Sequence, residues 1–130
     1  MPKKELKNNK YDLEKRLIDF AVRIINVVEA LPNTRAANHI GGQLLRCGTA
    51  PASNYGEAQS AESRNDFIHK IKIIFKELRE TRVWLKIIVR ISLAKSTKEI
   101  EALITECDEL ISIFVTSVKT AEKNKYKKKG

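Results

Sequence analysis

The side chains with the potential for acid–base chemistry lie in two segments of the sequence. They are an arginine, a serine, an asparagine and three carboxylates: Arg46, Ser53, Asn54, Glu57, Glu77 and Glu80. A carboxylate beside an arginine and an amide can act as a general base when its surroundings shift its pKa. The structural alternative is that these groups are partners for a partly buried Arg46 and for carbonyls freed at Pro51. We favour the structural interpretation and predict no catalytic residue.

Motifs that bind metals or cofactors are not found. A di-iron bundle needs Glu-x-x-His on two helices, whereas the only related spacing is Asp66 to His69, which occurs once. A Gly-rich phosphate loop, a CxxC pair and a Ser/His/Asp set are also missing. Cys47 and Cys107 lie in apolar patterns and are interpreted as buried thiols, with a disulfide as the alternative. We expect no metal, no cofactor and no enzymatic activity.

A row of basic residues indicates a possible phosphate-binding surface. Its members recur at spacings of four, three, seven and four, which aligns them on one side of a helix: Lys72, Lys76, Arg79, Lys86 and Arg90. Residues 64–95 carry a net charge of +6, and residues 96–118 carry −4. Either the acidic segment screens the basic one, or the row faces outward and symmetry multiplies it. No aromatic residue interleaves the row, so base stacking is not indicated.

The net charge of +9 is concentrated at the two ends of the chain. Residues 1–10 carry +3 and residues 119–130 carry +5. We therefore divide the chain into a basic N-terminal tail (1–10), a helical bundle (11–118) and a basic C-terminal tail (119–130). Such tails are either solubilising ends or electrostatic arms for phosphate. On the second interpretation Lys127, Lys128 and Lys129 join the candidate nucleic-acid-binding residues.

Apolar residues recur at helical spacing in four segments, with no strand-like alternation. The predicted helices span about 11–31, 34–62, 64–94 and 97–120. Ser63 before Asp66, and Ser96 before Glu99, resemble capping boxes. Pro51 predicts a kink or a break in the second helix, because proline cannot donate a backbone hydrogen bond. The short connections favour an all-α, antiparallel, up-down four-helix bundle.

Two of the predicted helices carry a second apolar face. The residues of these faces are candidates for an oligomer interface: Ile18, Val22, Ile25, Ile73, Trp84, Ile87 and Ile91. A bundle of this size buries one face of each helix, and monomers seldom expose a large apolar patch. We therefore predict a homo-oligomer. The alternative is a wider core, with Trp84 lying over an edge of the bundle.

The composition and the order of the residues indicate the number of domains and the location of the protein in the cell. The chain has 130 residues, of which 42% are hydrophobic and 32% charged, the size and composition of one helical domain. It begins with a polar segment that does not resemble a signal peptide, and its apolar runs are too short for a membrane span. We expect a cytoplasmic protein that does not enter a membrane.

Several blocks of the sequence resemble one protein family. These blocks are QLLRCGTAPASNYGE at 43–57, DFIHKIK at 66–72 and KELRETRVWL at 76–85, within a similarity over roughly 13–93. They are similar to the bacterial four-helix-bundle proteins of the rRNA intervening-sequence family, also called the S23 family. The resemblance implies a homopentameric barrel with no established enzymatic activity. It extends more distantly to accessory proteins of diversity-generating retroelements, which use basic surfaces to engage nucleic acid and a reverse transcriptase.

The family's recurrent polar positions match Arg46, Asn54, Glu57 and Glu80. Cys47 and Ala50 stand where relatives often have serine, which removes hydroxyl groups near Pro51. Our leading hypothesis is a non-enzymatic oligomer associated with RNA or DNA through its basic surface. The alternative is a scaffold for protein–protein interaction that binds no nucleic acid. An enzyme that uses Glu57 and Glu80 is the least favoured hypothesis.

Overall fold

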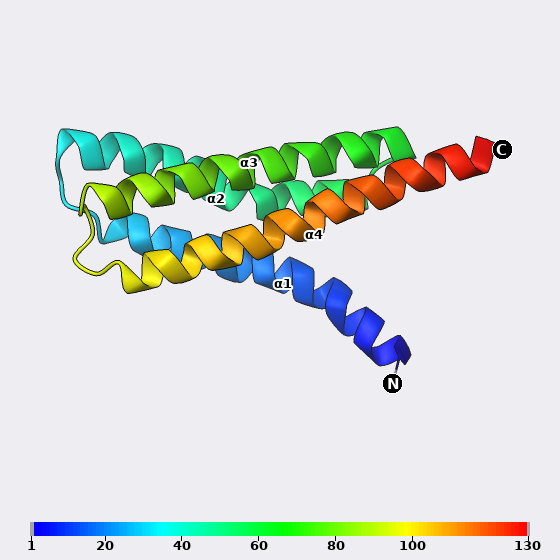
Figure 1. Ribbon diagram of the computed structural model, residues 1–130, viewed down its shortest axis with the longest axis horizontal. Coiled ribbons are helices and arrows are strands. Elements are labelled where there is room, and N and C mark those ends of the chain that lie inside the picture. Colours follow the sequence, from blue (N-terminus) through cyan, green and yellow to red (C-terminus); the bar gives the residue numbers. More distant parts are fainter. Residues whose placement is uncertain (1, 130) are drawn as a thin grey trace.

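Four α-helices make up the computed structural model, as the sequence predicts (Figure 1). Their bounds are α1 Pro2–Glu29, α2 Arg35–Gln59, α3 Arg64–Arg90 and α4 Lys98–Lys129. The structure describes the backbone of residues 2–129 and the side chains of residues 13–124, and no strand occurs within that range. The all-α fold is therefore confirmed. Helices α1 and α4 continue past the predicted limits of the bundle at residues 11 and 118, without an interruption there.

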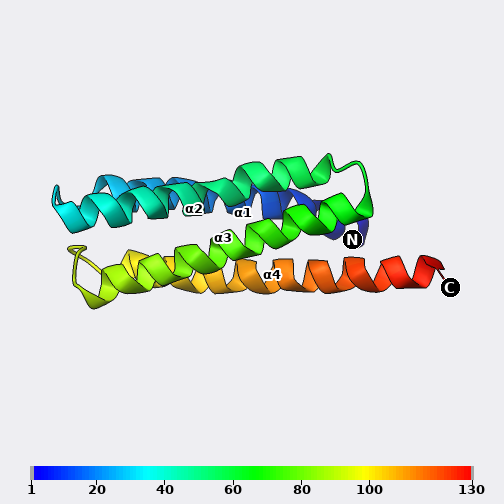
Figure 2. The same cartoon turned by 90° about the horizontal axis from the view of Figure 1, so that it is seen from above.

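Each helix packs against its neighbour along the chain, and successive helices run in opposite directions (Figure 1). Figure 2 shows α3 lying between α2 and α4. Contacts between α1 and α4 are fewer than those of the other neighbouring pairs, and Figure 1 shows these two helices diverging toward the termini. Within the described residues α1 does not contact α3, so these two helices occupy opposite corners of the bundle.

The core is built from the predicted apolar faces of all four helices. Its fully buried side chains include Leu17, Phe20, Ile24, Leu44, Ile71, Ile74, Leu78, Leu85, Ile100, Leu103, Leu110 and Phe114. The apolar side chains of Leu13 and Leu31, near the ends of the first predicted helix, are half-buried because fewer neighbours cover them. Ile68, Thr81 and Ile88 are buried as well. Thr81 is tolerated because its hydroxyl donates to the Glu77 carbonyl oxygen at 2.8 Å.

Helix α2 continues through Pro51, so the break allowed for at this position does not occur. A proline inside a helix forfeits one backbone hydrogen bond, but Pro51 is buried and α2 packs against both α1 and α3. Gly48, one turn earlier, lies against α1: an added Cβ would be 2.8 Å from Ile24 Cγ2. The small residues of this segment therefore permit the close approach of α1 to α2.

The starts of α3 and α4 are capped by serine side chains. Ser63 accepts a hydrogen bond from the Asp66 amide at 3.1 Å, as predicted. Ser96 accepts from the Lys98 amide at 3.3 Å, but the Glu99 carboxylate accepts from Arg23 of α1. The predicted box at Ser96 is therefore incomplete, because Arg23 offers Glu99 a charge-assisted bond.

Among residues 2–129, no helix is long and apolar enough to cross a membrane.

Candidate nucleic-acid interface

The predicted basic row faces outward from α3. Its five members, Lys72, Lys76, Arg79, Lys86 and Arg90, are all exposed. The buried residues of α3 include Ile74, Leu78 and Leu85, which lie on the other side of the helix. The five cationic side chains of the row therefore lie on one solvent-facing surface, as their spacing in the sequence predicted. We call this surface the α3 row.

Most of the α3 row has no carboxylate partner among the side chains that the structure describes. Lys72 Nζ lies 3.0 Å from Glu122 Oε1 of α4. The other four members form no ion pair with a described residue. A second ion pair between α3 and α4 uses Arg82, whose Nε lies 2.5 Å from Asp108 Oδ1, but Arg82 is outside the row. Four of the five cationic groups are therefore exposed and without an ion pair to a described residue.

The carboxylates of α4 pair mainly with α1. Arg16 donates from Nε to Glu106 Oε2 at 3.0 Å and from Nη2 to Glu106 Oε1 at 2.5 Å. The same Nη2 lies 3.5 Å from Glu109, and Arg23 Nε donates to Glu99 at 2.8 Å. The alternative that α4 screens α3 holds for Lys72, which pairs with Glu122, and for Arg82, which pairs with Asp108, while the other four members of the row pair with no described carboxylate. Direct ion pairing between neighbouring helices requires side chains that reach each other, and exposed charges farther apart than about 8–10 Å interact little at physiological salt.

The candidates in the C-terminal segment lie outside the described side chains. Lys127, Lys128 and Lys129 belong to α4, whose backbone extends to Lys129. The structure does not test their assignment as nucleic-acid-binding residues, which stays a prediction.

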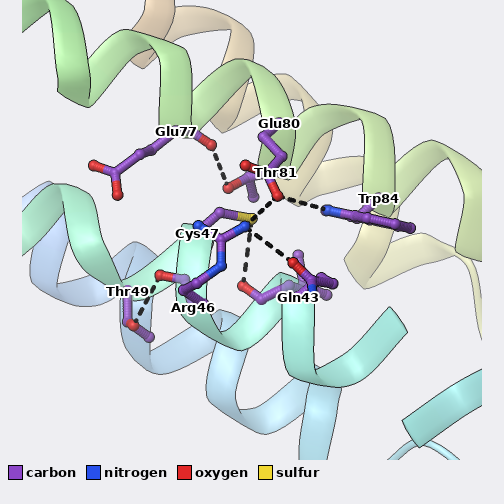
Figure 3. Close-up of polar contacts among 9 residues, drawn as sticks. Gln43, Arg46, Cys47, Thr49, Glu77, Glu80, Thr81 and Trp84 are labelled. Carbon is purple, nitrogen blue, oxygen red and sulfur yellow. Dashed lines mark hydrogen bonds and ion pairs between the residues drawn. The ribbon is translucent and has the colours of Figure 1, made fainter. Parts of the chain in front are cut away.

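The polar cluster predicted on α2 and α3 is a helix–helix contact (Figure 3). Arg46 of α2 forms an ion pair with Glu80 of α3, and the indole N–H of Trp84 donates to the same Glu80 carboxylate at 3.1 Å. Asn54 Nδ2 donates to Glu77 Oε1 at 2.7 Å. Two cross-links therefore join α2 to α3, and both use carboxylates that sequence reasoning had singled out.

Two details of the predicted cluster are wrong. Arg46 is not partly buried, because its side chain is 54% exposed. The hydroxyl group of Ser53 donates to the Ala50 carbonyl, not to the Cys47 carbonyl that Pro51 leaves without its helical donor. Glu57 of the predicted cluster is exposed and takes no part in either cross-link.

Burial alters the acidity of three groups beside this contact. Desolvation raises the pKa of Glu77 above its ordinary value, while the hydrogen bond from Asn54 and the charge of Arg46 oppose the rise. Desolvation also raises the pKa of Cys47, and it raises the pKa of Cys107 to about 12. Both thiols are free and buried, and Cys107 Sγ donates to the Leu78 carbonyl oxygen at 3.0 Å. They are packing groups rather than nucleophiles, since a thiol reacts as its thiolate.

The candidate interface residues divide into two groups. Ile18, Val22 and Ile25 of α1 are 40–49% exposed, and Ile73 and Ile91 of α3 are 37% and 50% exposed. Trp84 and Ile87 are instead half-buried against the core, as the alternative of a wider core expected for Trp84. The Trp84 ring also meets His39 edge-on, with centroids 5.9 Å apart.

Two further exposed apolar residues were missed. Leu45 of α2 is 37% exposed, and Val83 of α3 is 53% exposed within the α3 row. Neither residue belongs to a periodic apolar stripe, so helical periodicity could not identify them as candidates for an interface.

No group of three His, Cys, Asp or Glu side chains suited to a metal is present among the described residues.

The fold and the exposed cationic row define a class of small, all-helical protein with a basic outer face. The chain belongs to the family described as 23S rRNA-intervening sequence protein, which matches residues 9–116. This confirms the resemblance seen in the sequence. A similar solved structure is a protein of unknown function from the S23 ribosomal protein family of Bacteroides thetaiotaomicron. It is 32% identical, with a TM-score of 0.76, over 82% of this chain and 98% of that chain. No curated protein matches the sequence.

Proposed function

We propose that the chain is a non-enzymatic, homo-oligomeric bundle protein that associates with RNA or DNA through the α3 row. The observation that carries the proposal is the exposure of five aligned cations, four of which have no ion-pair partner among the described residues. Cationic side chains that meet phosphates release condensed counterions, which supplies affinity without reading the base sequence. The family's name, which refers to an intervening sequence of 23S rRNA, is consistent with a role near RNA. The cytoplasmic location expected from the sequence is part of this proposal.

The oligomer in this proposal is assembled through the exposed apolar faces of α1 and α3. These helices occupy opposite corners of the bundle, so their faces are two different surfaces of one subunit. An α1 face that meets the α3 face of the next copy makes a head-to-tail contact, and such contacts generate a ring when the rotation closes. The family resemblance favours five subunits. A ring repeats the α3 row in every subunit and so multiplies the basic surface.

A second candidate function is a scaffold that binds another protein. The observation that favours it is the exposure of Ile18 and Val22, each 49%. Such a patch is suited to a protein partner as well as to another copy of the chain. A scaffold of this kind does not require the α3 row, so measurements with nucleic acid separate the two functions.

The test is binding of fluorescent duplexes and structured RNA to the full chain across a salt series. A matched variant replaces Lys125, Lys127, Lys128 and Lys129 with glutamine, which removes the basic C-terminal segment and keeps the α3 row. We expect the logarithm of the binding constant to fall linearly with the logarithm of salt concentration in both proteins. Binding that disappears in the variant would assign any affinity to the C-terminal lysines. Absence of binding by the full chain at low salt would leave the scaffold as the better proposal.

A further inference from the structure

A cavity of about 370 Å³ lies at the end of the bundle where α1 finishes and α4 begins. Residues from the last two turns of α1, from the connection between α1 and α2, from the connection between α3 and α4, and from the first turn of α4 line it. Its volume is near the lower end of the range for small-molecule sites. None of the residues assigned above to the α3 row or to the polar cluster lines it. The cavity is therefore a separate feature of the subunit.

The interior of this cavity is apolar. Val27 and Ile100, which are 8% and 1% exposed, belong to the core. Leu31 and Ala94 are half-buried and pack against the core beside them. An apolar body placed here would lose its contact with water on several sides, which favours binding roughly in proportion to the area covered.

The charged residues that line the cavity have a positive balance. Arg23 and Lys95 contribute two cations, against the single carboxylate of Glu99. Glu99 is bound by Arg23 Nε at 2.8 Å, whereas the exposed Lys95 forms no ion pair with a described residue. A guanidinium has five N–H donors, so Arg23 can hold Glu99 and still donate to a second anion. Lys95 offers three more donors.

A second cavity provides an internal comparison. It has about 350 Å³, lies toward the opposite end of the bundle, and is also bounded by α1 and α4. Its lining includes Leu13, Tyr55 and Phe114 but no charged residue. The two cavities are alike in size. They differ in the cationic groups, which are present only at the first.

We propose that the first cavity binds a small amphiphilic acid, with an aliphatic tail against Val27, Leu31 and Ile100 and a carboxylate at Lys95 and Arg23. The chemical class is a medium-chain carboxylate. This site is independent of the proposed association with nucleic acid, since it shares no residue with the α3 row.

The experiment titrates butyrate, hexanoate and octanoate into the full chain, with isotope-labelled valine, leucine and isoleucine methyl groups observed by NMR. We expect saturable shifts at Val27, Leu31 and Ile100, with smaller changes at Leu13 and Ile71 of the second cavity. Each added CH₂ should tighten binding by about fourfold until the cavity is filled. Octanoate that shifts both cavities equally, or that shows no saturation, would overturn the proposal.

Two controls test the head group and the cavity separately. Octylamine has the same tail with the opposite charge, and it should bind more weakly than octanoate. Lys95→Gln should weaken octanoate several-fold and leave 1-octanol unchanged, because the alcohol lacks the carboxylate. Ala30→Phe places an aromatic ring from an exposed lining position into the cavity and should abolish the shifts, with an unchanged circular dichroism spectrum as the check on folding. Equal affinity for octylamine and octanoate would contradict the assigned role of Lys95 and Arg23.

Discussion

Helices α1 and α3 share a pattern of basic and apolar faces but use their basic residues differently. Both carry arginine or lysine on one side and a second apolar face on another. On α1, Arg16 and Arg23 reach the carboxylates of α4 and join two helices that otherwise contact each other little. On α3, four of the five members of the row project into solvent with no ion pair to a described residue.

The difference shows that an acidic helix does not neutralise every basic residue of the helices that pack against it. Helix α4 packs extensively against α3, yet most of its paired carboxylates turn toward α1. The α3 row lies on the side of α3 opposite its buried face, so most of its side chains project away from these carboxylates. We therefore expect changes on α1 to alter stability and changes in the α3 row to alter binding.

The largest expected effect concerns assembly, because α1 and α3 each supply one apolar face. Val22→Lys and Ile91→Lys should each reduce the particle mass measured by light scattering to that of a monomer, since a lysine in an apolar contact leaves a buried unpaired charge. Mixing the two variants should restore a dimer, because each retains the face that the other variant lacks. Both residues are exposed in the subunit, so each variant should keep its helical circular dichroism spectrum. A particle mass that neither change lowers would contradict the head-to-tail arrangement.

The next effect concerns nucleic-acid binding by the α3 row. Replacing Lys76, Arg79 and Lys86 with glutamine should make the salt dependence of duplex binding shallower by roughly 2.7 in slope, about 0.9 for each phosphate that is no longer neutralised. The matched control is Arg23→Gln, which removes one positive charge from α1. It should leave the slope unchanged, because Arg23 lies on α1, which does not contact α3 within the described residues, and is not part of the α3 row. Equal effects per charge on both helices would indicate a general effect of net charge.

The free energy of unfolding should depend on the paired arginine of α1 and not on the lysines of the α3 row. Arg16→Gln leaves the Glu106 carboxylate, which is only 19% exposed, without its bidentate partner. We expect a loss of about 1–3 kcal/mol in the free energy of unfolding, measured with urea. Lys86→Gln should change it by less than about 0.5 kcal/mol, as is usual for an exposed position. A similar loss for both variants would remove the distinction between the two helices.

The packing of α1 against α2 can be tested with two glycines of the same helix. Gly48→Ala should lower the free energy of unfolding by about 1–2 kcal/mol, because the new methyl group would overlap Ile24. Gly42→Ala meets no atom within 4 Å and should raise stability by about 0.5–1 kcal/mol through helix propensity. Thermal unfolding monitored by circular dichroism distinguishes these opposite signs. A stabilising Gly48→Ala change would show that α1 can move away from α2 at little cost.

The smallest expected effect is the pH dependence of Glu77, which faces Asn54, Arg46 and Glu80. Its pKa is raised in the folded protein from the ordinary value of 4.5, so the folded state holds the proton more tightly than the unfolded state does. Its contribution to stability therefore falls as pH rises from 4.5 through the raised pKa. Glu77→Gln should be slightly more stable than the natural protein at pH 7, and the difference should vanish at pH 3. Lower stability of the variant at pH 7 would indicate that the charged carboxylate is favourable here.

The helices and the core could be predicted from the sequence because both depend on local periodicity. Leu17, Leu44 and Leu78 recur with neighbours at helical spacing, and all three are buried. The burial of Thr81 could not be predicted, because a hydroxyl inside an apolar face depends on its bond to the Glu77 carbonyl. The ion-pair partners of Glu99 and Arg46 could not be predicted in detail either, because they depend on which side chains meet across two helices.

The residues alone determined the four helices, their apolar faces, the alignment of the α3 row and the resemblance to the family, since each depends on the order of neighbouring residues. Only the tertiary structure decided that most of the paired carboxylates of α4 meet α1, that Trp84 is half-buried against the core, and that a cavity with cationic groups forms where α1 meets α4. These features depend on the distances between side chains far apart in the chain. Such distances follow from how the helices pack and not from the periodicity of any single helix.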